Sequence, residues 1–183
     1  MESSYLRYLA QAPDHDKDAI LEELMNSYGN DVWNFAYFLT RRPDMADDLS
    51  QEVFLSVYHN LFRFRGDCSI KSWLLTITRN KVLKVKRSAF LRKVILVDYV
   101  IPGGHTRSAE AEMFDRADTR HIWQAVMQIP LRFREILLLH VHYQLNGKEM
   151  AELLGIPEAT VKTRLYRARR KLEAILDKEK GRE

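Results

Sequence analysis

Apolar residues recur at helical spacing through the first half of the chain. The pattern covers three stretches, namely Ile20 to Leu39, Leu49 to Leu61 and Trp73 to Val85, with little of the alternation typical of strands. Asp44 and Asp47 precede the second stretch and are predicted to cap its helix and to stand in its first turn. The segment from Phe64 to Ser69 interrupts the pattern and predicts a loop. The first part of the chain is therefore expected to be a helical bundle.

Helical spacing fades from Leu91 to Arg120, where Pro102-Gly103-Gly104 and a mixed-charge stretch have the composition of a flexible tether. It returns at Ile122, stops at Pro130 and resumes from Ile136 to Val141. The sequence therefore predicts an all-α fold of two small helical domains joined by a flexible linker. The expected bounds are 1–91, 92–119 for the linker, and 120–183. The last seven residues, DKEKGRE, are expected to fray.

Residues 147–172 have the pattern of a helix-turn-helix. Met150, Leu153 and Leu154 form an apolar face, Ala151 is small enough for a close helix crossing, and Gly155 suits a tight left-handed turn. Pro157 then fits the start of a second helix. That helix has an inward stripe formed by Val161, Leu165, Ala168 and Leu172.

The other faces of this second helix carry bases and hydroxyl groups. Six basic residues and no acid lie between Thr160 and Lys171. A helix that presents such groups outward is suited to the DNA major groove. The outward residues are Thr160, Lys162, Thr163, Arg164, Tyr166, Arg167 and Arg170.

Charge is distributed unevenly along the chain. The 183 residues carry a net charge of only +4, with 46% hydrophobic and 30% charged residues, as expected of a soluble globular protein. Yet the segment between Asp67 and Asp98 contains eight basic residues and no acidic residue. Together with the basic helix after Gly155, this segment predicts two contacts with one long polyanion.

Several other classes of protein are disfavoured. No apolar run approaches the roughly 20 residues that cross a bilayer, and the N-terminus does not resemble a secretory signal, so a cytoplasmic location is expected. Cys68 is the only cysteine, which excludes an intramolecular disulfide or a multi-cysteine metal site. His140 and His142 are two residues apart on a predicted helix and therefore point to different faces. We expect no catalytic residue, metal or cofactor, and hence no enzyme.

Two segments also resemble one known family. The stretch "MAELLGIPEATVKTRLYRARRKL" resembles the C-terminal, promoter-binding domain of extracytoplasmic-function (ECF) sigma factors, and "DMADDLSQEVFLSVYHNLFRFRGDCSIKSWLLTITRN" resembles their N-terminal domain. The resemblance covers roughly residues 20 to 90 and 120 to 176, in the order of the family. It implies a protein that binds core RNA polymerase and promoter DNA, and that is restrained by an anti-sigma factor, often a membrane-anchored one.

The resemblance also implies roles for particular residues. Contact with core polymerase falls on one face of a helix, at Asp48, Gln51, Glu52 and Leu55. Recognition and opening of the −10 element are assigned to Phe64, which is expected to be an exposed aromatic residue. The other residues assigned to this role are Arg65, Asp67, Arg79, Asn80 and Lys84. Trp73 is expected in the core. Recognition of the −35 element falls on Thr160, Lys162, Thr163, Arg164, Tyr166 and Arg167.

Two departures from the family bear on promoter preference. Lys84 stands where the family often has an aspartate, and Gly147-Lys148-Glu149 replaces the usual Tyr-Glu-Glu. An operator-binding regulator and a polymerase-binding decoy without promoter activity remain as alternatives. A regulator of the response type would show an alternating βα pattern in residues 1–90, which are predicted to be helical.

Overall fold

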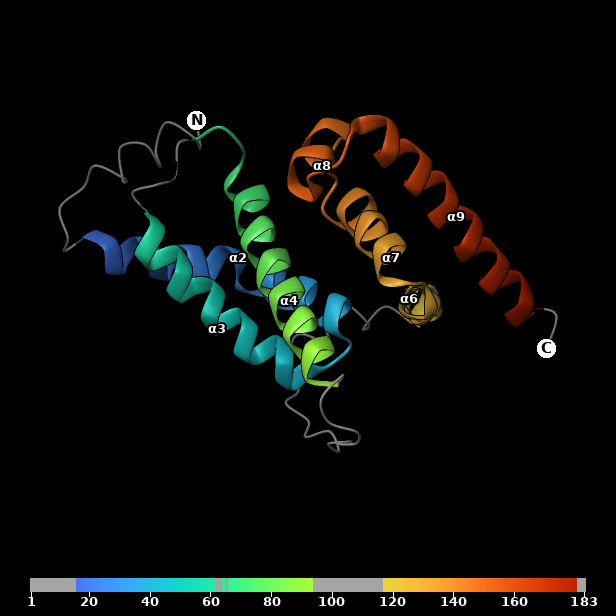
Figure 1. Ribbon diagram of the computed structural model, residues 1–183, viewed down its shortest axis with the longest axis horizontal. Helices are drawn as coiled ribbons and strands as arrows, with labels where there is room; N and C mark the ends of the chain where they lie inside the picture. Colours follow the sequence, from blue (N-terminus) through green and yellow to red (C-terminus); the bar gives the residue numbers. More distant parts are fainter. Residues whose placement is uncertain (1–15, 62–63, 65, 94–116, 181–183) are drawn as a thin grey trace. The chain divides into compact units, whose positions relative to one another are not determined.

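The computed structural model describes residues 16–61, 64, 66–93 and 117–180, which are helical apart from short turns and contain no strand (Figure 1). The chain divides between Thr106 and Arg107 into two compact units. The predicted all-α class with two helical domains is confirmed. The predicted linker, 92–119, overlaps the ends of two helices, and its central residues, 94–116, lie outside the described residues.

In the described residues, the N-terminal unit consists of three long helices, α2 (Asp16–Thr40), α3 (Pro43–Asn60) and α4 (Ile70–Lys93). They pack side by side, as the blue, teal and green ribbons of Figure 1 show. Each helix buries one apolar stripe, and removal of these side chains from water stabilises the bundle. The core includes Val32, Phe35 and Leu39 of α2, Leu49, Val53 and Val57 of α3, and Leu74, Leu75 and Val82 of α4.

The start of α3 differs from the prediction. Its N-cap residue is Arg42, whose side chain makes no capping hydrogen bond, and Pro43 provides the first turn. Asp44 does lie in that turn, where its hydrogen bond with Arg42 lowers the pKa of its carboxyl group. Asp47 has no capping role, because it lies inside the helix and accepts a hydrogen bond from Trp33 Nε1 at 2.6 Å. It therefore connects α3 to α2.

The described part of the C-terminal unit, 117–180, contains α6 (Ala117–Gln128), α7 (Leu131–Leu137), the π-helical turn η2 (Leu138–His142), α8 (Gly147–Leu154) and α9 (Glu158–Lys180). The predicted interruption at Pro130 is confirmed, since α7 begins directly after it. Arg134 is buried there and donates to the carbonyl oxygen of Ile129 at 2.9 Å, so its charge is not available to a partner. The expected fraying of residues 177–180 is wrong, because α9 continues to Lys180, and residues 181–183 lie outside the described residues. Gln128 Nε2 also donates to Glu179 Oε1 at 3.1 Å.

Candidate polymerase and nucleic-acid interfaces

The face of α3 assigned to polymerase is exposed along its length. Asp48, Gln51, Glu52 and Leu55 all point to solvent, and the Leu55 side chain is 59% exposed although it is apolar. The opposite face of the same helix is buried through Ala46, Leu49, Val53 and Val57. The surface therefore combines acidic groups with one uncovered apolar side chain. We call it the α3 face.

The loop before α4 does not present the aromatic residue that the sequence suggested. Phe64 is only 6% exposed and belongs to the core cluster, so its expected exposure is wrong. Its ring packs against that of Trp73, with 5.0 Å between the centroids. Asp67 is exposed, whereas Arg65 lies outside the described residues. Phe64 is thus a core residue, and Trp73 carries the more accessible ring.

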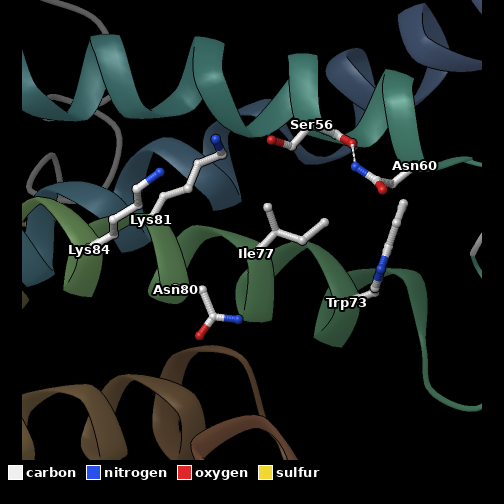
Figure 2. A pocket seen from close by; sticks show the side chains of 7 residues that line it. All are labelled: Ser56, Asn60, Trp73, Ile77, Asn80, Lys81 and Lys84. Carbon is white, nitrogen blue, oxygen red and sulfur yellow. Dashed lines mark hydrogen bonds between the residues drawn. The ribbon is translucent and has the colours of Figure 1, made fainter.

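A pocket of about 430 Å³ lies between α3 and α4, close to Trp73 (Figure 2). The Trp73 ring stands at one end and the Lys81 and Lys84 side chains stand at the other, with Ile77 between them (Figure 2). Asn60 donates from Nδ2 to the Ser56 carbonyl oxygen at 2.8 Å, which fixes its amide at the edge of α3. The lining residues are Ser56, Asn60, Trp73, Ile77, Asn80, Lys81 and Lys84.

This pocket brings together part of the predicted −10 group. Asn80 and Lys84 are exposed and line it, although the Asn80 side chain points away from α3 in Figure 2. Arg79 is half-buried and is not among the lining residues. Sequence reasoning missed Ser56, Asn60, Ile77 and Lys81. A signal was present, because positions 73, 77, 80, 81 and 84 share one face of a helix.

One ion pair connects the α3 face with the pocket. Lys81 Nζ lies 3.2 Å from Glu52 Oε2, across the contact between α4 and α3. The Lys81 side chain is 23% exposed, while that of Glu52 is 57% exposed. Glu52 therefore remains accessible to a partner while it holds Lys81.

The helix-turn-helix has the predicted geometry. Asn146 caps α8 by accepting from the backbone N–H groups of Lys148 and Glu149, and Glu149 Oε2 accepts from Asn146 N in return. Gly155 ends the helix at φ 66°, in the left-handed region. The carbonyl oxygen of Pro157 accepts from Val161 N and so begins the ladder of α9. This turn fixes where the exposed face of α9 starts.

The exposed face of α9 carries most of the predicted −35 group. Lys162, Thr163, Tyr166 and Arg167 are exposed, and Tyr166 reaches 65% although it is aromatic. Thr160 and Arg164 are half-buried at the side of this face. Val161 and Ala168 are buried on the opposite side, as predicted.

Two contacts determine how freely basic side chains of α9 can reach DNA. Lys162 Nζ lies 3.4 Å from Glu158 Oε1, but both side chains are largely exposed, so the pair can open at small cost. Arg169 Nη2 donates instead to Nε2 of His140 in η2 at 2.9 Å. The guanidinium of Arg169 is thus directed toward the body of the unit, which distinguishes it from Arg167.

The departure at Gly147 also has a structural counterpart. A Cβ atom at this position would lie 3.1 Å from Glu158 Oε1 at the start of α9. Glycine therefore leaves room for the Glu158 carboxylate beside the first turn of α8. A larger residue at this position would require the Glu158 side chain to move.

Comparison with known proteins identifies the class. Residues 24–90 match the family model Sigma-70 region 2, and residues 120–172 match Sigma-70, region 4. Both are regions of RNA polymerase sigma factors, and region 2 precedes region 4 along the chain. The chain belongs to the extracytoplasmic-function family of sigma factors.

Individual relatives span nearly the same length. The ECF RNA polymerase sigma factor SigM of Bacillus subtilis (strain 168) is 27% identical over 159 residues, which cover 86% of this chain and 96% of SigM. The RNA polymerase sigma factor NccH of Alcaligenes xylosoxydans xylosoxydans is 30% identical over 135 residues, covering 72% of this chain and 73% of NccH.

A solved structure shares the fold. The sigma factor RpoE, crystallised with the anti-sigma factor NepR from Bartonella quintana, matches with a TM-score of 0.66 at 22% identity, over 85% of this chain and 95% of RpoE. Among the described helices of our chain, none is both long and apolar enough to cross a membrane.

Proposed function

We propose that this sigma factor, which directs promoter-specific initiation of transcription, divides its work among three surfaces. The α3 face binds core RNA polymerase, the pocket between α3 and α4 receives single-stranded −10 DNA, and the exposed face of α9 binds the −35 duplex. The observation that carries the proposal is the exposed basic face of α9, held by a packed turn, in a chain that also exposes the acidic α3 face. A promoter-binding regulator has no need of the second surface.

The α9 surface suits duplex DNA because it offers both charge and hydrogen-bonding groups. Arg167 can donate two parallel hydrogen bonds to a guanine edge or to a phosphate, and Lys162 can neutralise a phosphate. Thr163 donates to the Ala159 carbonyl oxygen at 3.0 Å, which orients its hydroxyl group and leaves its methyl group for apolar contact with a base. Tyr166 supplies an exposed ring beside them.

The pocket between α3 and α4 suits an unpaired nucleotide. The Trp73 ring can stack on a base, and the Asn60 amide can bond to a base edge. Lys81 and Lys84 can neutralise the backbone, while Asn80 can bond to a base on the side of α4 that faces away from α3. This assignment gives Trp73 the stacking role first expected of Phe64. Sequence-tolerant stacking together with phosphate neutralisation would stabilise the opened strand.

We assign no chemical step to this chain. Sigma factors are initiation factors, and phosphodiester bonds are formed by the polymerase, so the proposed residues bind and orient DNA only. No cofactor is required for that task. The cytoplasm, where polymerase and chromosome meet, is the proposed location.

We also propose restraint by an anti-sigma factor, a partner that is often membrane-anchored in this family. The resemblance to the ECF family supports this, as does the structural likeness to a sigma factor crystallised with an anti-sigma factor. The α3 face fits such a partner, since it offers Leu55 as an apolar contact beside Asp48 and Glu52. Occupation of this face would block polymerase.

Run-off transcription with purified core polymerase tests the proposal. Adding the chain should start transcripts at discrete positions on genomic fragments retained by the holoenzyme. An operator-binding regulator or a polymerase-binding decoy would yield no transcript under these conditions. The absence of initiation, with binding to core polymerase intact, would favour the decoy.

A further inference from the structure

The Glu52–Lys81 ion pair joins two surfaces that the proposed function keeps separate. Glu52 belongs to the α3 face, together with Asp48 and Leu55. Lys81 lines the pocket between α3 and α4, and its ammonium group reaches Glu52 at 3.2 Å. The Glu52 carboxylate can therefore pair either with Lys81 of the same chain or with a basic group of a partner.

The two lysines of the pocket differ in this respect. Lys84 forms no ion pair with the described part of the chain and is exposed. Lys81 is less exposed, because its ammonium is held against α3 by Glu52. In the free protein, Lys84 can bind a phosphate directly, whereas Lys81 must first break its ion pair with Glu52.

We propose that this ion pair couples polymerase binding to single-strand binding. A basic group of core polymerase that takes up Glu52 releases the Lys81 ammonium, which then binds a backbone phosphate in the pocket. The inference rests on the proposed roles of the α3 face and the pocket. The free chain is thereby kept weak toward single-stranded DNA, and it gains affinity when polymerase is bound.

Thermodynamic linkage makes the effect reciprocal. If Lys81 and polymerase compete for Glu52, removing Lys81 must strengthen polymerase binding, and removing Glu52 must strengthen DNA binding by the free chain. Because both side chains are partly exposed, water and salt screen the pair, and its coupling should amount to about two- to fivefold in affinity. The effect should fade at high salt.

Four full-length chains test the coupling, namely the natural chain, Glu52→Gln, Lys81→Gln and the double variant. The first measurement is their affinity for core polymerase at low salt. Lys81→Gln should bind about two- to fivefold more tightly than the natural chain, and it should have no effect in the Glu52→Gln background. Arg87→Gln removes a positive charge from an exposed position elsewhere on α4 and should not tighten binding.

The second measurement is binding of a fluorescently labelled oligodeoxythymidine by the same chains without polymerase. Glu52→Gln should raise the affinity about two- to fivefold, and this gain should vanish when Lys81 is also replaced. A gain that persists in the double variant would reflect net charge alone and would overturn the proposal. Undetectable binding by Glu52→Gln would overturn it as well.

The two levels of inference fail in different ways. If Glu52→Gln leaves polymerase binding unchanged, the proposed role of this residue in the α3 face is wrong. If Glu52→Gln weakens polymerase binding while Lys81→Gln does not strengthen it, the face is correct and the coupling is wrong. Thermal unfolding of all four chains checks that each remains folded.

Discussion

Phe64 packs its ring against Trp73, with the centroids 5.0 Å apart and the planes tilted by 53°. Phe64 is nearly fully buried, while Trp73 is half-buried and also lines the pocket between α3 and α4. Phe64 therefore packs in the core against the ring of Trp73, and Trp73 borders the pocket. Substitutions at these two positions should have different consequences.

Phe64→Ala should lower the stability of the N-terminal unit, because it removes a large side chain from a packed cluster. Substitutions of this kind typically cost about 3 to 5 kcal/mol. Denaturant unfolding measures the loss directly, and Phe64→Leu should lose less because it keeps part of the volume. A variant that unfolds like the natural chain but fails only in promoter opening would show that Phe64 meets DNA.

Asp47 and Asp48 are neighbours in sequence with different expected roles. Asp47→Ala should lower stability by about 1 to 3 kcal/mol, because it leaves the Trp33 indole N–H without its partner. Asp48→Lys, combined with Glu52→Lys, should instead weaken assembly with core polymerase while helicity and unfolding stay close to those of the natural chain. Pull-down with core polymerase and thermal unfolding separate the two effects, and Glu23→Lys on α2 is the control for charge reversal.

Asp47 and Asp48 also show which features of the fold the sequence could predict. Helical spacing correctly predicted the three long N-terminal helices and the exposed α3 face, because a buried stripe of 3.6-residue period leaves the opposite face in solvent. It could not show that Asp47 meets Trp33. That contact depends on how α2 packs against α3, which local pattern does not determine.

The helix-turn-helix was more predictable than the loop before α4. Gly155, Pro157 and the stripe at Val161 and Ala168 act within one short segment, so local rules were sufficient. An aromatic in a loop can instead turn outward or fold back on the core, and both look the same in sequence. Arg169 illustrates the same difficulty, since only the fold brings it to His140, 29 residues away.

Promoter binding by the holoenzyme should weaken steeply with salt, because each neutralised phosphate releases a counterion. The slope of log affinity against log salt concentration measures the number of such contacts. If Arg167 contacts a phosphate, Arg167→Ala should reduce that slope by about one. Arg169→Ala should change it less, since the Arg169 guanidinium is already bound to His140. Equal slopes for the natural chain and Arg167→Ala would show that Arg167 meets no phosphate.

The division of labour between the two units predicts which defects a pre-opened promoter can repair. If α9 binds duplex DNA, Arg167→Ala should weaken the first, closed complex, and loss of one good bidentate base contact costs about 1 to 3 kcal/mol. If the pocket receives unpaired bases, Asn80→Ala should spare the closed complex and impair strand opening. Trp73→Ala should do the same, with stacking worth about 1 to 3 kcal/mol per base.

A template whose −10 region is already mismatched supplies the opening in advance. It should therefore substantially restore transcription by Asn80→Ala. Trp73→Ala should be restored as well, provided that unfolding measurements confirm that it folds. Arg167→Ala should not be restored on a promoter that depends on its −35 element, because the duplex contact is still missing. Thr163→Val tests the same surface without a change in charge.

Transcription from duplex and mismatched templates, measured for all these variants, tests whether α9 and the pocket have separate roles. Equal rescue of Arg167→Ala and Asn80→Ala would contradict them.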